Sequence, residues 1–399
     1  MFGFLWAPDA ARWQRASNAG NFRSVHVQKR LIARVDPEMP VTLADLRRYA
    51  VARSLFAPTT LKRAMQKLGF VQADPIRAPA RAQDLMLRHR VTNYRVDDLE
   101  RRYAALGIAE DFFVNYGFVT SDVQALMHPR TGVSRWSPTR KARAQALLEF
   151  VRERGSVHPR EVDAHFSQGS VTNYWGGSSS ATTHLLDGMH YRGLLRVARR
   201  DAGVRVYTAH EHASATLNTA ARRERIDRLI DVVVNKYAPL PALSLSALVR
   251  RLRYAVPQWR RELNSAVLRT RERLAHARIE GVDWYWPADE HPAVAEPQDV
   301  VRFLAPFDPA VWDRRRFEMF WGWAYRFEAY TPASKRKLGY YALPMLWRDR
   351  VIGWGNLAVS DGALNVDIGY ASASAPRELR FKREVEAELE RMRAFLRLD

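Results

Sequence analysis

The stretch 181–208, ATTHLLDGMHYRGLLRVARRDAGVRVYT, decides how this chain folds. Leucines and Met189 recur along its first part at the spacing of one helix face, which predicts a helix over 181–191. Two runs of alternating apolar residues follow, over 194–198 and 204–208, and they predict the two strands of a β-hairpin. A helix that leads directly into a hairpin is typical of a winged-helix DNA-binding module.

The residues before this stretch complete the module. Their pattern predicts a first helix over 142–154 and a short second helix over 159–165 that begins at a proline. A winged-helix module is therefore predicted over 142–212. The tip of its hairpin carries Arg199 and Arg200, at the place where a wing meets DNA phosphates.

The N-terminal part shows a similar beginning. Residues 1–40 have no sustained period and are predicted to be an extension, whereas 41–141 are predicted to form a first winged-helix-like module. Thr42 and Thr60 each stand before a helical pattern and can cap its first turn. Gly69 is expected to end the second of these helices, because glycine readily adopts the left-handed conformation that closes a helix. An extended segment follows.

The C-terminal half continues this pattern and then changes character. A third winged-helix-like module, with helices before a strand pair, is predicted over 213–290. Residues 291–399 are predicted to be rich in β-strands, with a hairpin at Asp361-Gly362 and a charged helix from about Arg377. The fold class predicted from the residues is α+β.

The composition favours a nucleic acid as the partner. There are 63 Lys and Arg residues against 43 Asp and Glu, and the net charge of +20 attracts polyanions, although an Arg-rich background would explain part of it. Cysteine is absent, which excludes disulfides, thiolate catalysis and cysteine-ligated metals. No run approaches the ~20 apolar residues that span a bilayer. A cytoplasmic, nucleoid-associated protein without a membrane partner is expected.

The segment Gln72-Ala73-Asp74 is the strongest candidate for catalysis. In an extended segment Gln72 and Asp74 point to the same side, so an amide and a carboxylate share one small volume. Such a pair suits hydrolysis at a sugar carbon, because the amide can orient a water and the carboxylate can deprotonate it or stabilise a cation. The spacing alone favours an alternative, in which Asp74 caps the turn at Pro75 and Gln72 bonds nearby backbone.

Other chemistry has weaker support. His210 and His212 lack the spacing of a metalloprotease, and no glycine-rich phosphate loop precedes a helix. We therefore predict neither a metal nor a cofactor.

Two series of residues resemble the YcaQ-like crosslink-repair DNA glycosylase family, also described as winged-helix DNA-binding proteins. The resemblance covers about 41–359. The first series is Leu68-Gly69-Phe70-Val71-Gln72-Ala73-Asp74-Pro75-Ile76, with Arg81 and Arg90 downstream. The second comprises Pro306-Phe307-Asp308-Pro309, Trp312-Asp313-Arg314-Arg315-Arg316, Tyr325-Arg326-Phe327-Glu328-Ala329-Tyr330-Thr331-Pro332, Lys335-Arg336 and Gly339-Tyr340-Tyr341-Ala342-Leu343-Pro344.

The resemblance implies a fold and an activity. The fold would be tandem winged-helix modules followed by a C-terminal β-barrel-like domain and a terminal helix. The activity would be that of a metal-independent DNA N-glycosylase in base excision repair, which removes N7-alkylated purines and unhooks interstrand crosslinks. Gln72 would position the attacking water and Asp74 would act as base or cation stabiliser. The partner would be double-stranded DNA that carries alkylated or crosslinked purines, and a monomer is expected.

Basic residues would hold the DNA backbone. The predicted contacts are Arg77, Arg81, Arg90, Arg199, Arg200, Arg314, Lys335 and Arg336.

The chain departs from the family pattern at two places, where a histidine and several charged groups are replaced. These are Asn115 and Tyr116, and then Trp354, Asn356 and Ala358. The departures leave the choice of lesion open. They also leave open a second function class, a non-catalytic winged-helix regulator that binds a DNA site, and a third, a structural nucleoid or RNA-associated protein.

Overall fold

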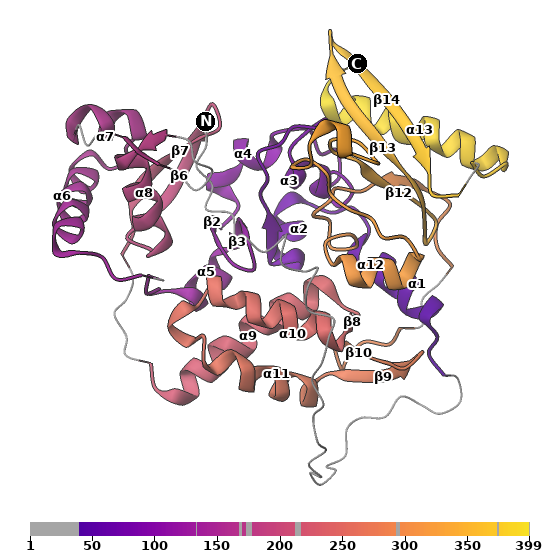
Figure 1. The fold of residues 1–399 in the computed structure, drawn as a ribbon, viewed down its shortest axis with the longest axis horizontal. Helices are drawn as coiled ribbons and strands as arrows, with labels where there is room; N and C mark the ends of the chain where they lie inside the picture. Colours follow the sequence, from indigo (N-terminus) through magenta and orange to yellow (C-terminus); the bar gives the residue numbers. More distant parts are fainter. Residues whose placement is uncertain are drawn as a thin grey trace. The chain divides into compact units, whose positions relative to one another are not determined.

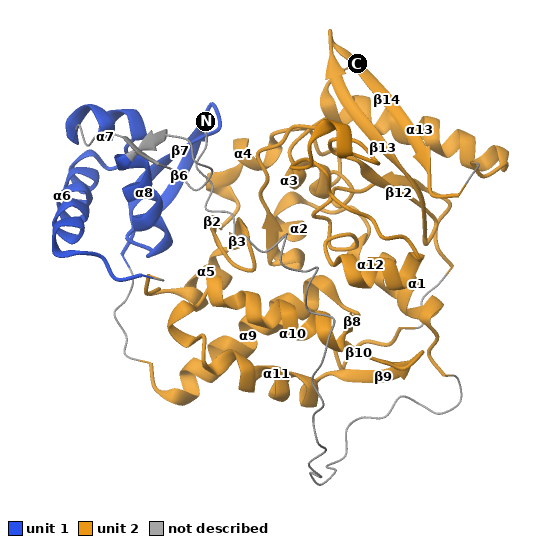
Figure 2. Cartoon of the chain, viewed as in Figure 1, with its two compact units in different colours: residues 1–33, 134–211 blue, residues 34–133, 212–399 orange. Residues whose placement is uncertain are grey.

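Two compact units make up the chain (Figure 1). The structure is a computed structural model and describes residues 40–132, 134–166, 170–172, 178–211, 217–292, 296–372 and 375–398. One unit lies within 134–211, and the described residues before and after it form the other (Figure 2). The predicted extension, residues 1–40, lies outside the described residues except for Pro40.

The first unit contains the helix and the β-hairpin that the stretch 181–208 predicts, and the two helices predicted before it. Its elements are α6 (Pro138–Arg154), α7 (Pro159–Phe166), β4 (Ser170–Thr172), β5 (Ser178–Ser180), α8 (Ala181–Tyr191), β6 (Leu195–Asp201) and β7 (Val204–Ala209). Ala202 and Gly203 join β6 to β7 with φ angles of 48° and 82°, the left-handed pair that a tight hairpin requires. Leu147, Val151 and Leu186 are fully buried in a core that belongs to this unit alone.

The second unit begins with two capped helices and a small sheet. Its elements are α1 (Leu43–Ser54), α2 (Leu61–Leu68), β1 (Phe70–Gln72), α3 (Ala82–Leu87), α4 (Asp98–Arg101), β2 (Ile108–Phe112), β3 (Tyr116–Thr120) and α5 (Ser121–Met127). Thr42 forms a capping box with Asp45, and the Thr60 side chain accepts from the Arg63 backbone, as the sequence predicts. The strands pair in the order β1-β3-β2.

The next segment of this unit places three helices against a second sheet. The elements are α9 (Thr219–Tyr237), β8 (Leu240–Pro241), α10 (Ala242–Arg251), α11 (Glu262–Arg273), β9 (Ala275–Ile279) and β10 (Val282–Trp286), with strand order β8-β10-β9. Ile226, Leu229, Ile230 and Val233 recur at helical spacing along α9 and are fully buried. They pack in one core with Phe70 of β1, so the segments on either side of 134–211 fold together.

The C-terminal segment forms an open sheet, which corrects the predicted barrel. Its elements are β11 (Val301–Phe303), α12 (Arg314–Trp321), β12 (Leu343–Trp347), β13 (Arg350–Ser360), β14 (Ala363–Tyr370) and α13 (Leu379–Leu396). The described strands pair only in the order β11-β12-β13-β14, whereas a barrel would also pair β14 with β11. Side chains of α13 cover the β11 edge instead: Glu388 accepts from the Phe303 backbone N at 3.1 Å, and Arg391 donates to the Val301 carbonyl at 3.2 Å.

No helix in the described part of the chain is long and apolar enough to cross a membrane.

Candidate active site

Strand β1 carries the first candidate residue and is fixed by helix α9. Helix α2 ends at Gly69, whose φ of 64° turns the chain into β1; a side chain there would meet Val232 of α9 at 2.7 Å. The buried Lys236 of α9 donates a hydrogen bond to the Phe70 carbonyl. Burial lowers the pKa of Lys236 well below its usual range.

The other side of β1 lies against β3 at very close range. Gln72 pairs with Gly117, and a Cβ on Gly117 would lie 2.2 Å from the Val71 carbonyl oxygen and 2.8 Å from the Gln72 Cα. Glycine is therefore required at 117. The Ala73 N–H donates to the Tyr116 carbonyl at 3.1 Å, which continues the pairing just past the end of β1.

The Gln72 amide is buried, and only its oxygen has a hydrogen-bond partner among the described residues. The side chain is 1% exposed, and its Oε1 accepts from the Trp312 indole Nε1 at 2.9 Å. An indole N–H can only donate, so this bond fixes the carbonyl end of the amide toward Trp312. The Nε2 group is buried and has no hydrogen-bond partner among the described residues. Gln72 thus presents an unused N–H donor.

The Asp74 carboxyl is also buried and half satisfied. It is 4% exposed; its Oδ1 accepts from the Ile76 backbone N at 2.9 Å, while its own N–H donates to Gln83 Oε1 at 3.2 Å. Burial raises the pKa of Asp74 to about 6, and the Ile76 hydrogen bond lowers it only in part. The turn-capping alternative is therefore correct for Asp74, yet Gln72 bonds a distant side chain rather than nearby backbone.

Two tyrosines that the sequence did not single out share the surroundings of Asp74. Burial is the first cause of the raised pKa of Tyr330, about 12, and of Tyr341, and the nearby charge of Asp74 raises both further. The Phe327 ring lies edge-on to both, with ring centroids 5.9 Å and 5.1 Å away. Tyr330 is 57% exposed, whereas Tyr341 is buried. Only the repeated aromatic residues of the family-like series pointed to them.

Arg90, predicted to contact DNA, has a structural position instead. Its side chain is 0% exposed, and its guanidinium binds the buried Asp308 carboxylate through both oxygens at 2.8 Å and 3.0 Å. It also donates to the carbonyls of Ser54 and Met86. A buried guanidinium with this many partners is not available to a phosphate, so we correct the prediction for Arg90.

The other residues predicted to contact DNA in the second unit differ in their exposure and in the partners that they already bind. Arg81 is nearly buried and forms an ion pair with Glu100. Arg314 donates to the carbonyls of Val311 and Pro306 and lies over the Tyr325 ring, so it also has a structural role.

Three of these cations are closer to solvent. Arg77 is exposed and forms a 3.7 Å ion pair with Asp97, and Lys335 is exposed as well. Arg336 donates to the Thr331 carbonyl and lies over the Tyr340 ring. The DNA contacts of Arg77, Lys335 and Arg336 therefore stay predictions.

The predicted contacts in the first unit lie at its hairpin. Arg199 pairs with Asp201 at 3.0 Å while its side chain is 56% exposed, and Arg200 donates to the Gly203 carbonyl. Their contact with DNA stays a prediction.

The two departures from the family pattern both have structural partners. The Tyr116 hydroxyl donates to Glu110 at 2.8 Å, next to the strand that holds Gln72. Asn356 donates to the Leu338 carbonyl at 2.8 Å, and a Cβ on Gly339 would meet the Asn356 side chain at 2.3 Å. The Trp354 ring stacks on Trp323.

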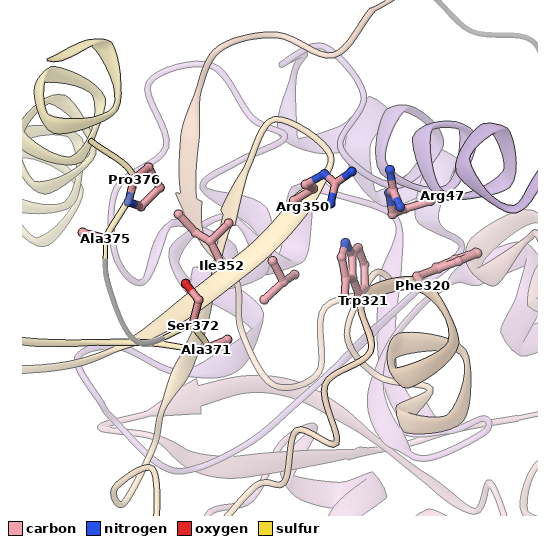
Figure 3. A pocket seen from close by; sticks show the side chains of 10 residues that line it. Arg47, Phe320, Trp321, Arg350, Ile352, Ala371, Ser372, Ala375 and Pro376 are labelled. Carbon is pink, nitrogen blue, oxygen red and sulfur yellow. The ribbon is translucent and has the colours of Figure 1, made fainter. Parts of the chain in front are cut away.

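A separate pocket of about 580 Å³ opens beside the C-terminal sheet, and Figure 3 shows Arg350, Arg47 and Trp321 lining it together. Arg47 is neutralised there by its ion pair with Asp349. None of the residues predicted to act in catalysis or DNA binding lines this pocket. Its lining residues are Arg47, Phe320, Trp321, Arg350, Val351, Ile352, Ala371, Ser372, Ala375 and Pro376.

Comparison with known families places the chain among the DNA glycosylases, hydrolases that act on N-glycosyl bonds in DNA repair. The family model described as "DNA glycosylase AlkZ-like" matches residues 65–395, and the chain therefore belongs to that family. This confirms the family that the two motif series predict. Among solved structures, Streptomyces sahachiroi DNA glycosylase AlkZ is similar with a TM-score of 0.57 and 14% identity, over 90% of this chain and 97% of that one. At this identity the similarity shows the fold.

Proposed function

We propose that the chain hydrolyses the N-glycosidic bond of N7-alkylated purines in double-stranded DNA, and that it unhooks interstrand crosslinks formed through such bases. The observation that carries this proposal is the pair at the end of β1: a buried carboxylate with a pKa of about 6, and a buried amide N–H without a partner among the described residues. The chain belongs to a family of DNA glycosylases, and this supports an N-glycosyl bond as the bond that the pair hydrolyses.

The chemistry follows from the charge of the lesion. Alkylation at N7 makes the purine a cationic leaving group, so the bond between C1′ and N9 can break without prior protonation, and its electron pair neutralises the base. The sugar becomes oxocarbenium-like, and a water oxygen then adds to C1′. Gln72 Nε2 would hold that water, and the ionised Asp74 would stabilise the cation and accept the water's proton. This route needs no metal or cofactor.

Nonspecific attraction would hold the duplex while the site searches for a lesion. A net charge of +20 provides that attraction, and the exposed Arg77 follows the catalytic segment closely in sequence. Binding to undamaged duplex should then weaken steeply with salt and show little preference for sequence.

The test is excision from a duplex with a single N7-methylguanine, and from a duplex with a nitrogen-mustard crosslink, under single-turnover conditions. The wild type is expected to release the base and unhook the strands. Gln72→Ala should lower the rate about 100-fold, the usual cost of removing one positioned donor. The matched control is Gln258→Ala, which removes an amide that bonds the Met127 and Pro129 carbonyls outside the site. Intact substrates after incubation with folded, DNA-binding wild type would refute the proposal; a sequence-specific footprint in that case would favour a regulator.

The Trp312 indole should contribute by holding the amide of Gln72 in one orientation. Trp312→Phe removes that donor, so the Gln72 amide can rotate and exchange the positions of its oxygen and nitrogen. We expect the rate of excision to fall about fivefold, the effect of one ordinary hydrogen bond. Trp321→Phe is a matched control, because its indole donates to the Asp349 carbonyl at the same 2.9 Å distance outside the site. Equal rates in the two variants would contradict this role.

A further inference from the structure

We propose that Arg140 and Arg192 together hold a phosphate of duplex DNA, and that helix α8 beneath them does not read bases. The inference rests on the proposed function for its partner, duplex DNA, and adds a binding site that the proposed function does not name. It concerns only the unit within 134–211. In a typical winged helix the third helix enters the major groove and contacts base edges, so the proposal gives the same plan a different use.

The side of α8 that faces away from the core of its unit is covered. Ala181, His184 and Gly188 recur on this side at helical spacing, and all three are partly buried. Trp136, from the segment before α6, lies over Gly188: a Cβ at position 188 would be only 3.0 Å from the indole ring. No residue of α8 is fully exposed. A helix covered in this way offers little surface to the edges of base pairs.

Two arginines converge on the same place. The guanidinium carbon of Arg192 lies 3.8 Å from the centroid of the Trp136 ring, and that of Arg140 lies 5.2 Å from it. A Cβ on Gly188 would be 3.4 Å from Arg140 Nη2 and 3.8 Å from Arg192 Nη1. Both cations therefore lie against one ring and one glycine, close enough together for one phosphate group to accept from both.

Neither arginine forms an ion pair with an acidic residue in the part of the chain that the structure describes. Arg140 and Arg192 donate instead to backbone carbonyls of α8 and of the segment before α6, at 2.7 to 3.4 Å. Asp187 of α8 is bound by Arg205 at 2.9 Å. Carbonyl groups accept N–H donors but do not neutralise the positive charge, so two cations stay together without a counter-charge.

A phosphate would relieve the repulsion between these two cations. Burial lowers the pKa of Arg192, and the charge of Arg140 lowers it further. A phosphate that accepts from both would replace this repulsion by charge-assisted hydrogen bonds. Each guanidinium has five N–H donors, more than the carbonyl bonds use. The phosphodiester of a DNA duplex is the phosphate that a DNA glycosylase meets.

The double variant Arg140→Gln/Arg192→Gln tests the proposal in the full chain. Its affinity for an undamaged duplex is measured by fluorescence anisotropy over a range of salt concentrations. We expect the slope of the logarithm of affinity against the logarithm of salt to become shallower by about one, the contribution of one phosphate. At about 0.1 M salt the affinity should fall about eightfold.

The matched control is Arg152→Gln/Arg154→Gln, which removes the same charge from the same unit. Arg154 also lies over an aromatic ring, that of Phe150 at 5.0 Å, and Arg152 is paired with Glu211 at 3.4 Å. Both stand at the other end of α6 from Arg140. The control should keep the slope of the wild type. An equal change in the two double variants would show that net charge alone attracts the duplex, and would overturn the proposed contact.

Arg140→Gln alone guards against a loss of folding. Arg140 is exposed, so this variant should keep the Tm of the wild type while it removes one of the two cations. Its affinity at about 0.1 M salt should fall about threefold, part of the effect of one phosphate contact. A folded variant that binds the duplex as tightly as the wild type would contradict the proposal.

The claim that α8 does not read bases has its own test. The wild type should bind undamaged duplexes of unrelated sequence with affinities that agree within about twofold, since phosphate contacts carry no sequence information. A tenfold preference for one sequence that is lost in His184→Ala would show that α8 reads bases after all. If the double variant loses binding to duplex RNA and keeps binding to DNA, the partner is RNA and the proposal is wrong. Binding to undamaged duplex needs no excision, so these results are independent of whether the chain excises N7-methylguanine.

Discussion

Asp74→Asn is expected to lower single-turnover excision of N7-methylguanine about 1,000-fold at pH 8, within the range for loss of a general base. The substituted amide keeps an oxygen that can accept from the Ile76 N–H, so the turn should survive and only the charge is lost. In the wild type the carboxyl must be ionised to act. Since its pKa is raised to about 6, excision should rise with pH through about 6 and then level off.

The same variant is expected to be more stable than the wild type at pH 8. Burial raises the pKa of Asp74 from 3.8 to about 6, so the folded protein holds this proton more tightly than the unfolded chain does. Stability conferred by the protonated form is complete below pH 4 and is lost as the pH rises through 6. This pKa shift corresponds to a loss of about 3 kcal/mol of unfolding free energy above pH 6. Asp74→Asn avoids that cost, so the unfolding free energy of the variant should exceed the wild type's at pH 8 and match it near pH 4.

Urea unfolding at several pH values, with excision assayed on the same samples, checks both parts of this prediction. A variant that excises as fast as the wild type would remove Asp74 from the mechanism. A variant that is less stable than the wild type at pH 8 would show that the carboxylate is held by favourable contacts rather than strained by burial.

Arg90→Met should have the largest effect on stability. It removes one partner of a fully buried ion pair and leaves Asp308 uncompensated, which typically costs about 3–5 kcal/mol of unfolding free energy. It also removes the bonds to the Ser54 and Met86 carbonyls, which link the end of α1 and helix α3 to the segment before α12. Urea unfolding at neutral pH measures the loss.

Two further variants define the cause of that loss. Arg77→Met changes an exposed arginine and should shift stability by less than about 0.5 kcal/mol. Adding Asp308→Asn to Arg90→Met removes the unpaired charge and should recover part of the loss. If Arg90→Met instead unfolds at the same urea concentration as Arg77→Met and reduces the salt dependence of DNA binding, Arg90 contacts DNA after all.

The elements that the sequence predicted correctly are those with local signals. The caps at Thr42 and Thr60 and the end of α2 at Gly69 depend on residues within one turn. The hairpin at Asp361-Gly362 depends on two adjacent residues with positive φ.

The features that the sequence did not predict depend on contacts between distant segments. The family-like motif identified Gln72 and Asp74, but no local pattern shows that Trp312, 240 residues away, fixes the amide. No local pattern shows that Arg90 forms an ion pair with Asp308 either. The open sheet was missed for the same reason, since Glu388 of the terminal helix satisfies the edge of β11 in place of a strand.

The segments before and after residues 134–211 share one core, and this affects how the chain folds during its synthesis. Strand β1 is synthesised early, but its Phe70 carbonyl is held by Lys236, which emerges 166 residues later. At the usual rate of translation this separation corresponds to roughly ten seconds or more. Meanwhile residues 134–211, which have a core of their own, can fold as soon as they leave the exit tunnel. Strand β1 therefore cannot form its contact with helix α9 until the unit within 134–211 has been synthesised.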